Sequence, residues 1–99
     1  MLKKEFILEK LKQLKNKYNK EGFYILGIFG SYAKDTANNQ SDIDILYSTQ
    51  KGIENLYDKK QKLKQELQKI FHTKVDLASE KYLKSYVKDI IMKELIYVK

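Results

Sequence analysis

The 99-residue sequence contains no cysteine, which excludes disulfide bonds and thiolate metal sites. It contains a single histidine, His72, which cannot form a zinc site with other histidines. Any metal bound by this chain must therefore be held by oxygen atoms. Oxygen ligands favour a hard cation such as Mg²⁺.

Long apolar runs are also missing, so the sequence predicts no membrane-spanning segment. The opening residues, MLKKEFILEKL, carry charges throughout and do not have the pattern of a secretory signal. The expected location is the cytoplasm.

Arginine is absent, and the 20 basic residues, all lysines, leave a formal net charge of +7. Such a charge favours a polyanionic partner, and a DNA-binding regulator is one interpretation of it. The lysines are spread along the predicted helices, however, which is typical of solvated faces. A coding sequence poor in G and C explains them equally well, and we do not expect nucleic acid as a partner.

The length allows a single domain, residues 1–99. Hydrophobic periodicity and turn residues predict an α/β fold in which helices pack on a small mixed three-stranded sheet. A short connection favours an antiparallel first strand pair, and a long helix allows a parallel crossover to the third strand. The expected elements are a helix over 2–19, a strand over 23–29, a short helix over 31–35, a strand over 42–47, a helix over 53–71, a strand over 74–78 and a final helix capped by Ser79 or Ser85.

Two features suggest chemistry between the first two strands. Gly30 and Ser31 follow the first strand directly, where a turn that opens a helix presents unpaired N–H groups suited to a phosphate. Ser31 taken alone is more often a simple cap. Asp42 and Asp44 then lie two residues apart on a strand, so they point to the same face.

A third carboxylate completes the candidate metal site. Asp76 lies between apolar residues on the third strand, where an aspartate is hard to explain as core. Beside the second strand it would join Asp42 and Asp44. Carboxylates that meet in this way stay ionised comfortably only near a cation, and Mg²⁺ held by carboxylates and substrate phosphates is usual in nucleotidyl transfer.

The combined pattern resembles the minimal nucleotidyltransferases of the DNA polymerase β superfamily, over nearly the whole chain. The matching segments are Gly30-Ser31-Tyr32-Ala33, Ser41-Asp42-Ile43-Asp44-Ile45 and Val75-Asp76-Leu77, with the C-terminal I-I-M-K-E-L-I-Y. The resemblance implies a polymerase β-like nucleotidyltransferase fold.

The resemblance also implies site roles. Asp42 and Asp44 would bind two Mg²⁺ ions, and Asp76 would bind the ion beside the acceptor and help to deprotonate its hydroxyl. The acceptor oxygen would attack the α-phosphorus of ATP and release pyrophosphate. The expected nucleotide-binding residues are Gly30, Ser31, Ser41 and Lys34.

Small stand-alone members of this family are often MntA-like antitoxins paired with an all-helical HEPN ribonuclease toxin. The implied function is transfer of AMP to a hydroxyl of that toxin, that of a tyrosine, which neutralises it. A chain of this size has no room for a deep acceptor pocket, which agrees with an acceptor supplied by a partner protein.

One departure from the family keeps two alternatives open. The family commonly continues G-S-x-A-R-G, whereas this chain has Lys34 and Asp35. Lysine keeps the charge but lacks the guanidinium fork, and Asp35 replaces a permissive glycine. A catalytically weak or inactive antitoxin that blocks the toxin sterically is therefore one alternative, and a small-molecule (antibiotic) nucleotidyltransferase is the other.

Overall fold

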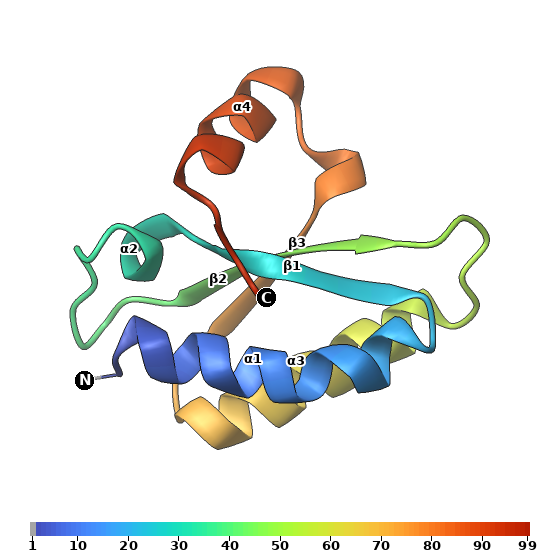
Figure 1. Cartoon of the computed structure of the whole chain (residues 1–99), viewed down its shortest axis with the longest axis horizontal. Helices are drawn as coiled ribbons and strands as arrows, with labels where there is room; N and C mark the ends of the chain where they lie inside the picture. The colour runs from blue at the N-terminus through green and yellow to red at the C-terminus, as the bar shows by residue number, and fades with distance from the viewer. Residues whose placement is uncertain (1) are drawn as a thin grey trace.

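A mixed sheet of four strands, in the order β3-β2-β1-β4, organises the chain (Figure 1). The computed structural model describes residues 2–99. No helix within these residues is both long and apolar enough to cross a membrane. The elements are α1 (Lys4–Asn19), β1 (Phe23–Phe29), α2 (Gly30–Ala33), β2 (Ile43–Thr49), α3 (Leu56–Phe71), β3 (Val75–Ser79), the 3₁₀ turn η1 (Glu80–Tyr82), α4 (Ser85–Glu94) and β4 (Ile96–Tyr97).

Both predicted strand pairings are confirmed. β1 and β2, which are joined by one short helix and a loop, run antiparallel. β2 and β3 run parallel because α3 carries the chain back across the sheet between them. The parallel register places Asp44 opposite Asp76, so the two strands bring these side chains to neighbouring positions.

The predicted number of strands was wrong, because the sheet has four and not three. α4 ends at Glu94, and β4 then pairs antiparallel with β1 at Gly27 and Ile28. The Val98 N–H extends this pairing by donating to the Leu26 carbonyl oxygen at 2.9 Å. The apolar C-terminal segment suits a helix when considered locally. The free edge of β1 offers it non-local backbone hydrogen bonds that periodicity does not reveal.

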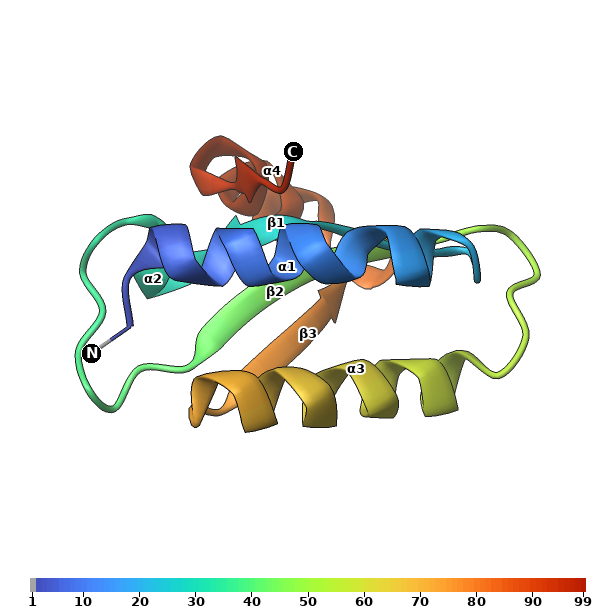
Figure 2. The ribbon, with the colours of Figure 1, turned by 60° about the horizontal axis from the view of Figure 1, so that its bottom comes forward.

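Helices α1 and α3 cover one face of the sheet, and α4 lies over the opposite face (Figures 1 and 2). α1 and α3 each bury one stripe of side chains spaced four or seven residues apart, as expected for amphipathic helices. Together with alternate strand residues these stripes form one hydrophobic core. The buried helix residues are Ile7, Leu11 and Tyr18 of α1 and Leu63, Leu67 and Phe71 of α3.

The face under α4 is packed much more sparsely. Ile91 is the one buried residue of α4, and Ile90 next to it is 60% exposed. Leu46 of β2 is buried but lies outside the main core cluster. The alternation along β2 that turns Ile45 into the core turns Asp44 and Leu46 to this second face. The second face therefore has room for polar side chains.

Gly27 lies where β4 pairs with β1, and a Cβ atom at this position would overlap the Ile96 carbonyl oxygen. We expect Gly27→Ala to displace β4 and to lower the free energy of unfolding by about 1–3 kcal/mol. Urea denaturation measures the loss. Hydrogen exchange at the Val98 amide should accelerate, since its bond to Leu26 depends on the same pairing.

Gly52→Ala is the matched control. A Cβ atom there meets nothing within 4 Å, although the residue has a φ of +77°. Gly52→Ala should lower the free energy of unfolding by about 1 kcal/mol through backbone strain alone. It should leave hydrogen exchange at the Val98 amide unchanged. A Gly27→Ala protein with a fully protected Val98 amide would contradict the β4 pairing.

Candidate active site

Three carboxylates approach one another at one end of β2. Asp44 and Asp76 are register partners on adjacent parallel strands, and such partners point to the same face of a sheet. Asp42 precedes β2 by one residue and lies two positions before Asp44. All three side chains are partly buried. The structure thus brings together the residues that the sequence singled out as candidate metal ligands.

The surroundings of Asp44 disfavour a negative charge. Its pKa is raised from 3.8 to about 6, first by burial and then by the nearby charges of Asp76, Asp42 and Glu94. The same mutual repulsion that raises this pKa would become attraction toward a bound cation. Asp44 is therefore the electrostatic centre of the cluster.

The donor set fits Mg²⁺ in company with a nucleotide. Within residues 2–99 no three His, Cys, Asp or Glu side chains are arranged to hold an ion by themselves. Mg²⁺ rarely needs such a cage, since it is usually bound through one or two carboxylates together with substrate phosphates and water. Asp44 and Asp76 supply two carboxylates side by side, which meets that requirement.

Asp42 is held at the rim of the cluster by a lysine. Lys74, which directly precedes β3, places its Nζ 3.7 Å from Asp42 Oδ2. The lysine side chain is 63% exposed, so the pair stabilises the fold by no more than about 1 kcal/mol. Sequence reasoning missed Lys74, because its position beside Asp42 follows from the parallel register of β2 and β3 and not from any local motif.

The Gly30 turn lies directly against Asp44. Gly30 has a φ of +73°, and a Cβ atom on it would overlap the Asp44 carboxylate. Only glycine tolerates both the left-handed backbone and this close approach. The turn expected to bind phosphate and the carboxylate expected to bind metal are therefore in contact, as a metal-nucleotide site requires.

A fourth carboxylate, that of Glu94, completes the surroundings of the turn. The Gly30 N–H donates to Glu94 Oε1 at 3.1 Å. Lys34 Nζ lies 3.5 Å from Glu94 Oε2. Sequence reasoning assigned Glu94 no role. Its one sequence signal is a carboxylate beside Lys93 at the end of α4, and that signal is weak.

The two serines lie in different settings. Ser31 follows Gly30 in α2, and its carbonyl oxygen accepts the Thr36 N–H at 2.9 Å. Ser41 lies in the loop before β2, where its Oγ accepts the Asn38 N–H at 2.9 Å. Ser41 is thus engaged in shaping the loop, and its expected contact with nucleotide stays a prediction.

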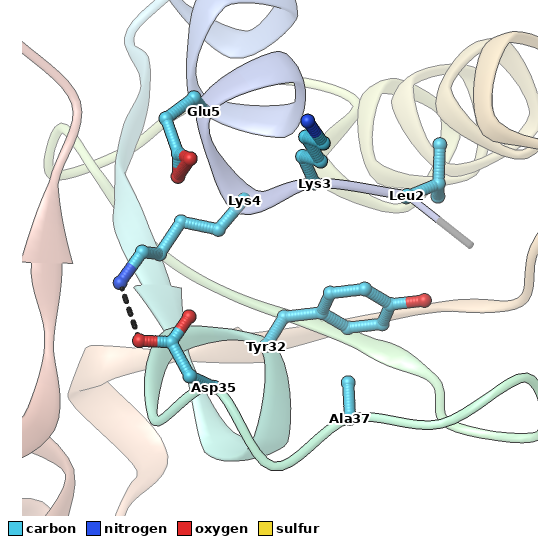
Figure 3. A pocket seen from close by; sticks show the side chains of 7 residues that line it. All are labelled: Leu2, Lys3, Lys4, Glu5, Tyr32, Asp35 and Ala37. Atoms are coloured by element: carbon cyan, nitrogen blue, oxygen red, sulfur yellow. Dashed lines mark hydrogen bonds and ion pairs between the residues drawn. The ribbon is translucent and has the colours of Figure 1, made fainter.

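The Lys34-Asp35 departure from the family pattern has a clear structural setting. Asp35 adopts a φ of 60°, the left-handed conformation that a glycine at this position accepts without strain. Its Oδ2 receives an ion pair from Lys4 Nζ at 2.9 Å, so α1 holds the substituted residue (Figure 3). A small hollow of about 210 Å³ adjoins this pair, and Tyr32 and Ala37 line it.

This geometry agrees with the comparison with protein families. The chain matches the nucleotidyltransferase domain family over residues 4–98 and belongs to that family. It is thus an enzyme of the nucleotidyltransferase class, and the resemblance seen in the sequence is confirmed.

Two relatives match almost end to end. A Methanocaldococcus jannaschii protein, provisionally named a protein adenylyltransferase, is 35% identical over 96 residues, covering 96% of this chain and 93% of the relative. The protein adenylyltransferase MntA of Thermococcus cleftensis is 31% identical over 96 residues, covering 92% of this chain and 95% of its own.

Solved structures share the fold. One described provisionally as a minimal nucleotidyltransferase superposes with a TM-score of 0.79 at 23% identity, covering 96% of this chain and 95% of its own. A toxin–antitoxin structure with AMP-PNP gives a TM-score of 0.70 at 21% identity, covering 99% of this chain and 73% of that one. At such identities the likeness is one of fold.

The raised pKa of Asp44 predicts a pH dependence of stability in the absence of divalent cations. An unfolded chain releases this proton near pH 3.8 and the folded chain near pH 6, so stability falls as pH rises between these values and stays lower above them. Asp44→Asn should lack this fall and be more stable than wild type at pH 7. Thermal unfolding from pH 4 to pH 7 measures the difference.

Asp89→Asn, which removes an exposed carboxylate of α4, is the control and should reproduce the wild-type pH dependence. If Asp44→Asn also parallels wild type from pH 4 to 7, the electrostatic role given to Asp44 is contradicted.

The left-handed conformation of Asp35 generates a separate prediction. Asp35→Gly and Asp35→Ala both remove the ion pair with Lys4, and they differ in whether backbone strain remains. Asp35→Ala should be less stable than Asp35→Gly by about 1 kcal/mol. Urea denaturation of the two variants in parallel tests this, and equal stabilities would contradict the strained conformation.

Proposed function

We propose that this chain is a Mg²⁺-dependent protein adenylyltransferase that acts as an antitoxin. It transfers AMP from ATP to a tyrosine hydroxyl of a HEPN-family ribonuclease toxin and thereby silences it. The observation that carries the proposal is the contact of the Gly30 turn with Asp44, the register partner of Asp76. The relatives are named protein adenylyltransferases, which agrees with the proposed transfer of AMP to a protein acceptor.

The nucleotide would lie along the second face of the sheet. The turn at Gly30 and Ser31 would bind the triphosphate through backbone N–H groups, with the Lys34 ammonium neutralising charge nearby. Lys34 is 54% exposed, so it can reach a phosphate without leaving a buried site. Ser41, at the end of the loop before β2, would border the same region.

Asp42, Asp44 and Asp76 would hold two Mg²⁺ ions. The bound ions would supply charge stabilisation to the attacking and leaving oxygens. The acceptor oxygen forms its new bond to the α-phosphorus, the bond from that phosphorus to the bridging oxygen breaks, and pyrophosphate leaves. Asp76 would take the hydroxyl proton of the acceptor, and Asp44 would anchor the nucleotide side.

A protein acceptor suits the shape of the molecule. Hollows of about 680 Å³ between α1 and β4 and about 460 Å³ beside the loop that follows β2 are lined by residues remote from the three aspartates. The aspartates instead lie partly exposed on an open face. An acceptor group carried by a docked partner can reach such a face, whereas a small antibiotic held in either of these hollows would lie away from the aspartates.

The decisive experiment incubates this chain with the product of the adjacent gene, taken as the candidate toxin, together with Mg²⁺ and ATP labelled at either the α- or the γ-phosphate. We expect the toxin to gain the α-label and not the γ-label, and intact mass spectrometry to show added AMP units. Peptide mapping should place them on tyrosine. Toxin that gains no mass while the complex still forms would contradict adenylylation.

Asp42→Asn with Asp44→Asn separates catalysis from steric neutralisation. Loss of both metal ligands should lower AMP transfer by more than about 100-fold, beyond what loss of an outer-shell partner causes. Asp89→Asn on α4 is the matched carboxylate control and should retain transfer. Neutralisation that survives in the double variant would instead support an antitoxin that acts by binding alone.

A further inference from the structure

Glu94 is the last residue of α4, and its side chain reaches across to the turn that follows β1. One carboxylate oxygen accepts the Gly30 N–H at 3.1 Å, and the other lies 3.5 Å from Lys34 Nζ. The Glu94 side chain is only 18% exposed, so both interactions are partly shielded from water. A hydrogen bond that involves an ionised group in such surroundings is stronger than a neutral one.

The Gly30 turn and the Lys34 ammonium are among the groups that the proposed function assigns to the triphosphate. A carboxylate there could act in two opposite ways. It could occupy the place of a phosphate and compete with the nucleotide, or it could fix the turn so that the remaining donors are ready for the nucleotide. The geometry of α2 distinguishes between the two.

Glu94 takes the place of a missing N-cap for α2. The residue at that position, Phe29, has no side-chain oxygen and makes no capping hydrogen bond. An N-cap side chain usually satisfies one of the first N–H groups of a helix and leaves others free. Glu94 likewise engages the N–H of Gly30, the first residue of α2. The next N–H groups, those of Ser31 and Tyr32, are not bonded to Glu94.

The turn is consequently held from two sides. The Asp44 carboxylate lies against the Cα atom of Gly30, and Glu94 binds its N–H. The second Glu94 oxygen also pairs with Lys34, which directly follows α2, so one carboxylate holds both ends of this short helix. Each contact restricts a group that a bound triphosphate would otherwise have to order, and such ordering weakens binding.

We propose that Glu94 is a positioning residue of the nucleotide site, an inference that rests on the proposed function. It fixes the Gly30 turn and Lys34 relative to each other, so that the Ser31 and Tyr32 N–H groups and the lysine face the triphosphate. Glu94 acts through these groups and does not itself touch the nucleotide. Removing it weakens nucleotide binding, whereas removing a competitor would strengthen it.

The test compares Glu94→Ala and Glu94→Gln by calorimetric titration of the full chain with ATP and Mg²⁺. Glu94→Ala should weaken ATP binding by about 10-fold, the lower end of what losing an outer-shell partner costs. Glu94→Gln still offers an oxygen to the Gly30 N–H and should stay within about 3-fold of wild type. Hydrogen exchange at the Gly30 amide, followed by NMR without nucleotide, should accelerate in Glu94→Ala and not in Glu94→Gln.

Glu80→Ala is the matched control, because it removes the other glutamate ion pair of this region, to Lys88 of α4 at 3.2 Å. It should leave ATP affinity and Gly30 exchange unchanged. Tighter ATP binding by Glu94→Ala, or unchanged binding by both Glu94 variants, overturns the inference while the proposed function stands. A wild-type chain that binds no ATP overturns both. If Glu94→Ala does not fold, Glu94→Asp takes its place, because the shorter side chain should lose its reach to the Gly30 N–H, and unchanged or tighter ATP binding by Glu94→Asp overturns the inference.

Discussion

The contact between Gly30 and the Asp44 carboxylate is the constraint on which the second face of the sheet depends. It requires a glycine with a left-handed backbone on one side and a partly buried aspartate on the other. The antiparallel register of β1 and β2 creates the contact, because it places Phe29, the residue before the turn, opposite Asp44. The parallel register of β2 and β3 then adds Asp76. Two pairings of opposite type thus converge on a single carboxylate.

The two faces of the sheet divide stability and chemistry between them. The face under α1 and α3 contains the continuous core and supplies most of the apolar burial. The face under α4 buries little more than Leu46 and Ile91. The repulsion around Asp44 is an energetic cost that the first face offsets. Destabilised, charged sites of this kind are common where function requires them.

Much of the fold followed from local pattern. Apolar periodicity located both long helices to within a few residues, and three strands were recognised by their runs of β-formers. Asp42, Asp44 and Asp76 could be grouped from the sequence alone, because strand alternation and a parallel crossover leave few other arrangements. These features depend on short stretches of sequence and on general rules of chain connection.

The features that could not be predicted all depend on contacts between distant segments. β4 is only two residues long and forms because the edge of β1 is free. Glu94 reaches a residue 64 positions earlier in the chain. Lys4 pairs with Asp35 across 31 positions, and this pairing accompanies an aspartate where the family pattern has glycine. No local periodicity marks any of these partners.

The separation between Gly30 and Glu94 has a consequence for the order in which the protein is made. Ribosomes add roughly 5–20 residues per second, so the 64 residues added after Gly30, up to and including Glu94, take roughly 3–13 s to synthesise. Once Asp76 has been added, a growing chain contains all three aspartates of the cluster but still lacks the Glu94 carboxylate that accepts the Gly30 N–H. The turn therefore reaches its final form only after the end of α4 has been synthesised. A ribosome stalled before α4 would hold a chain with every aspartate of the cluster and an unfinished turn.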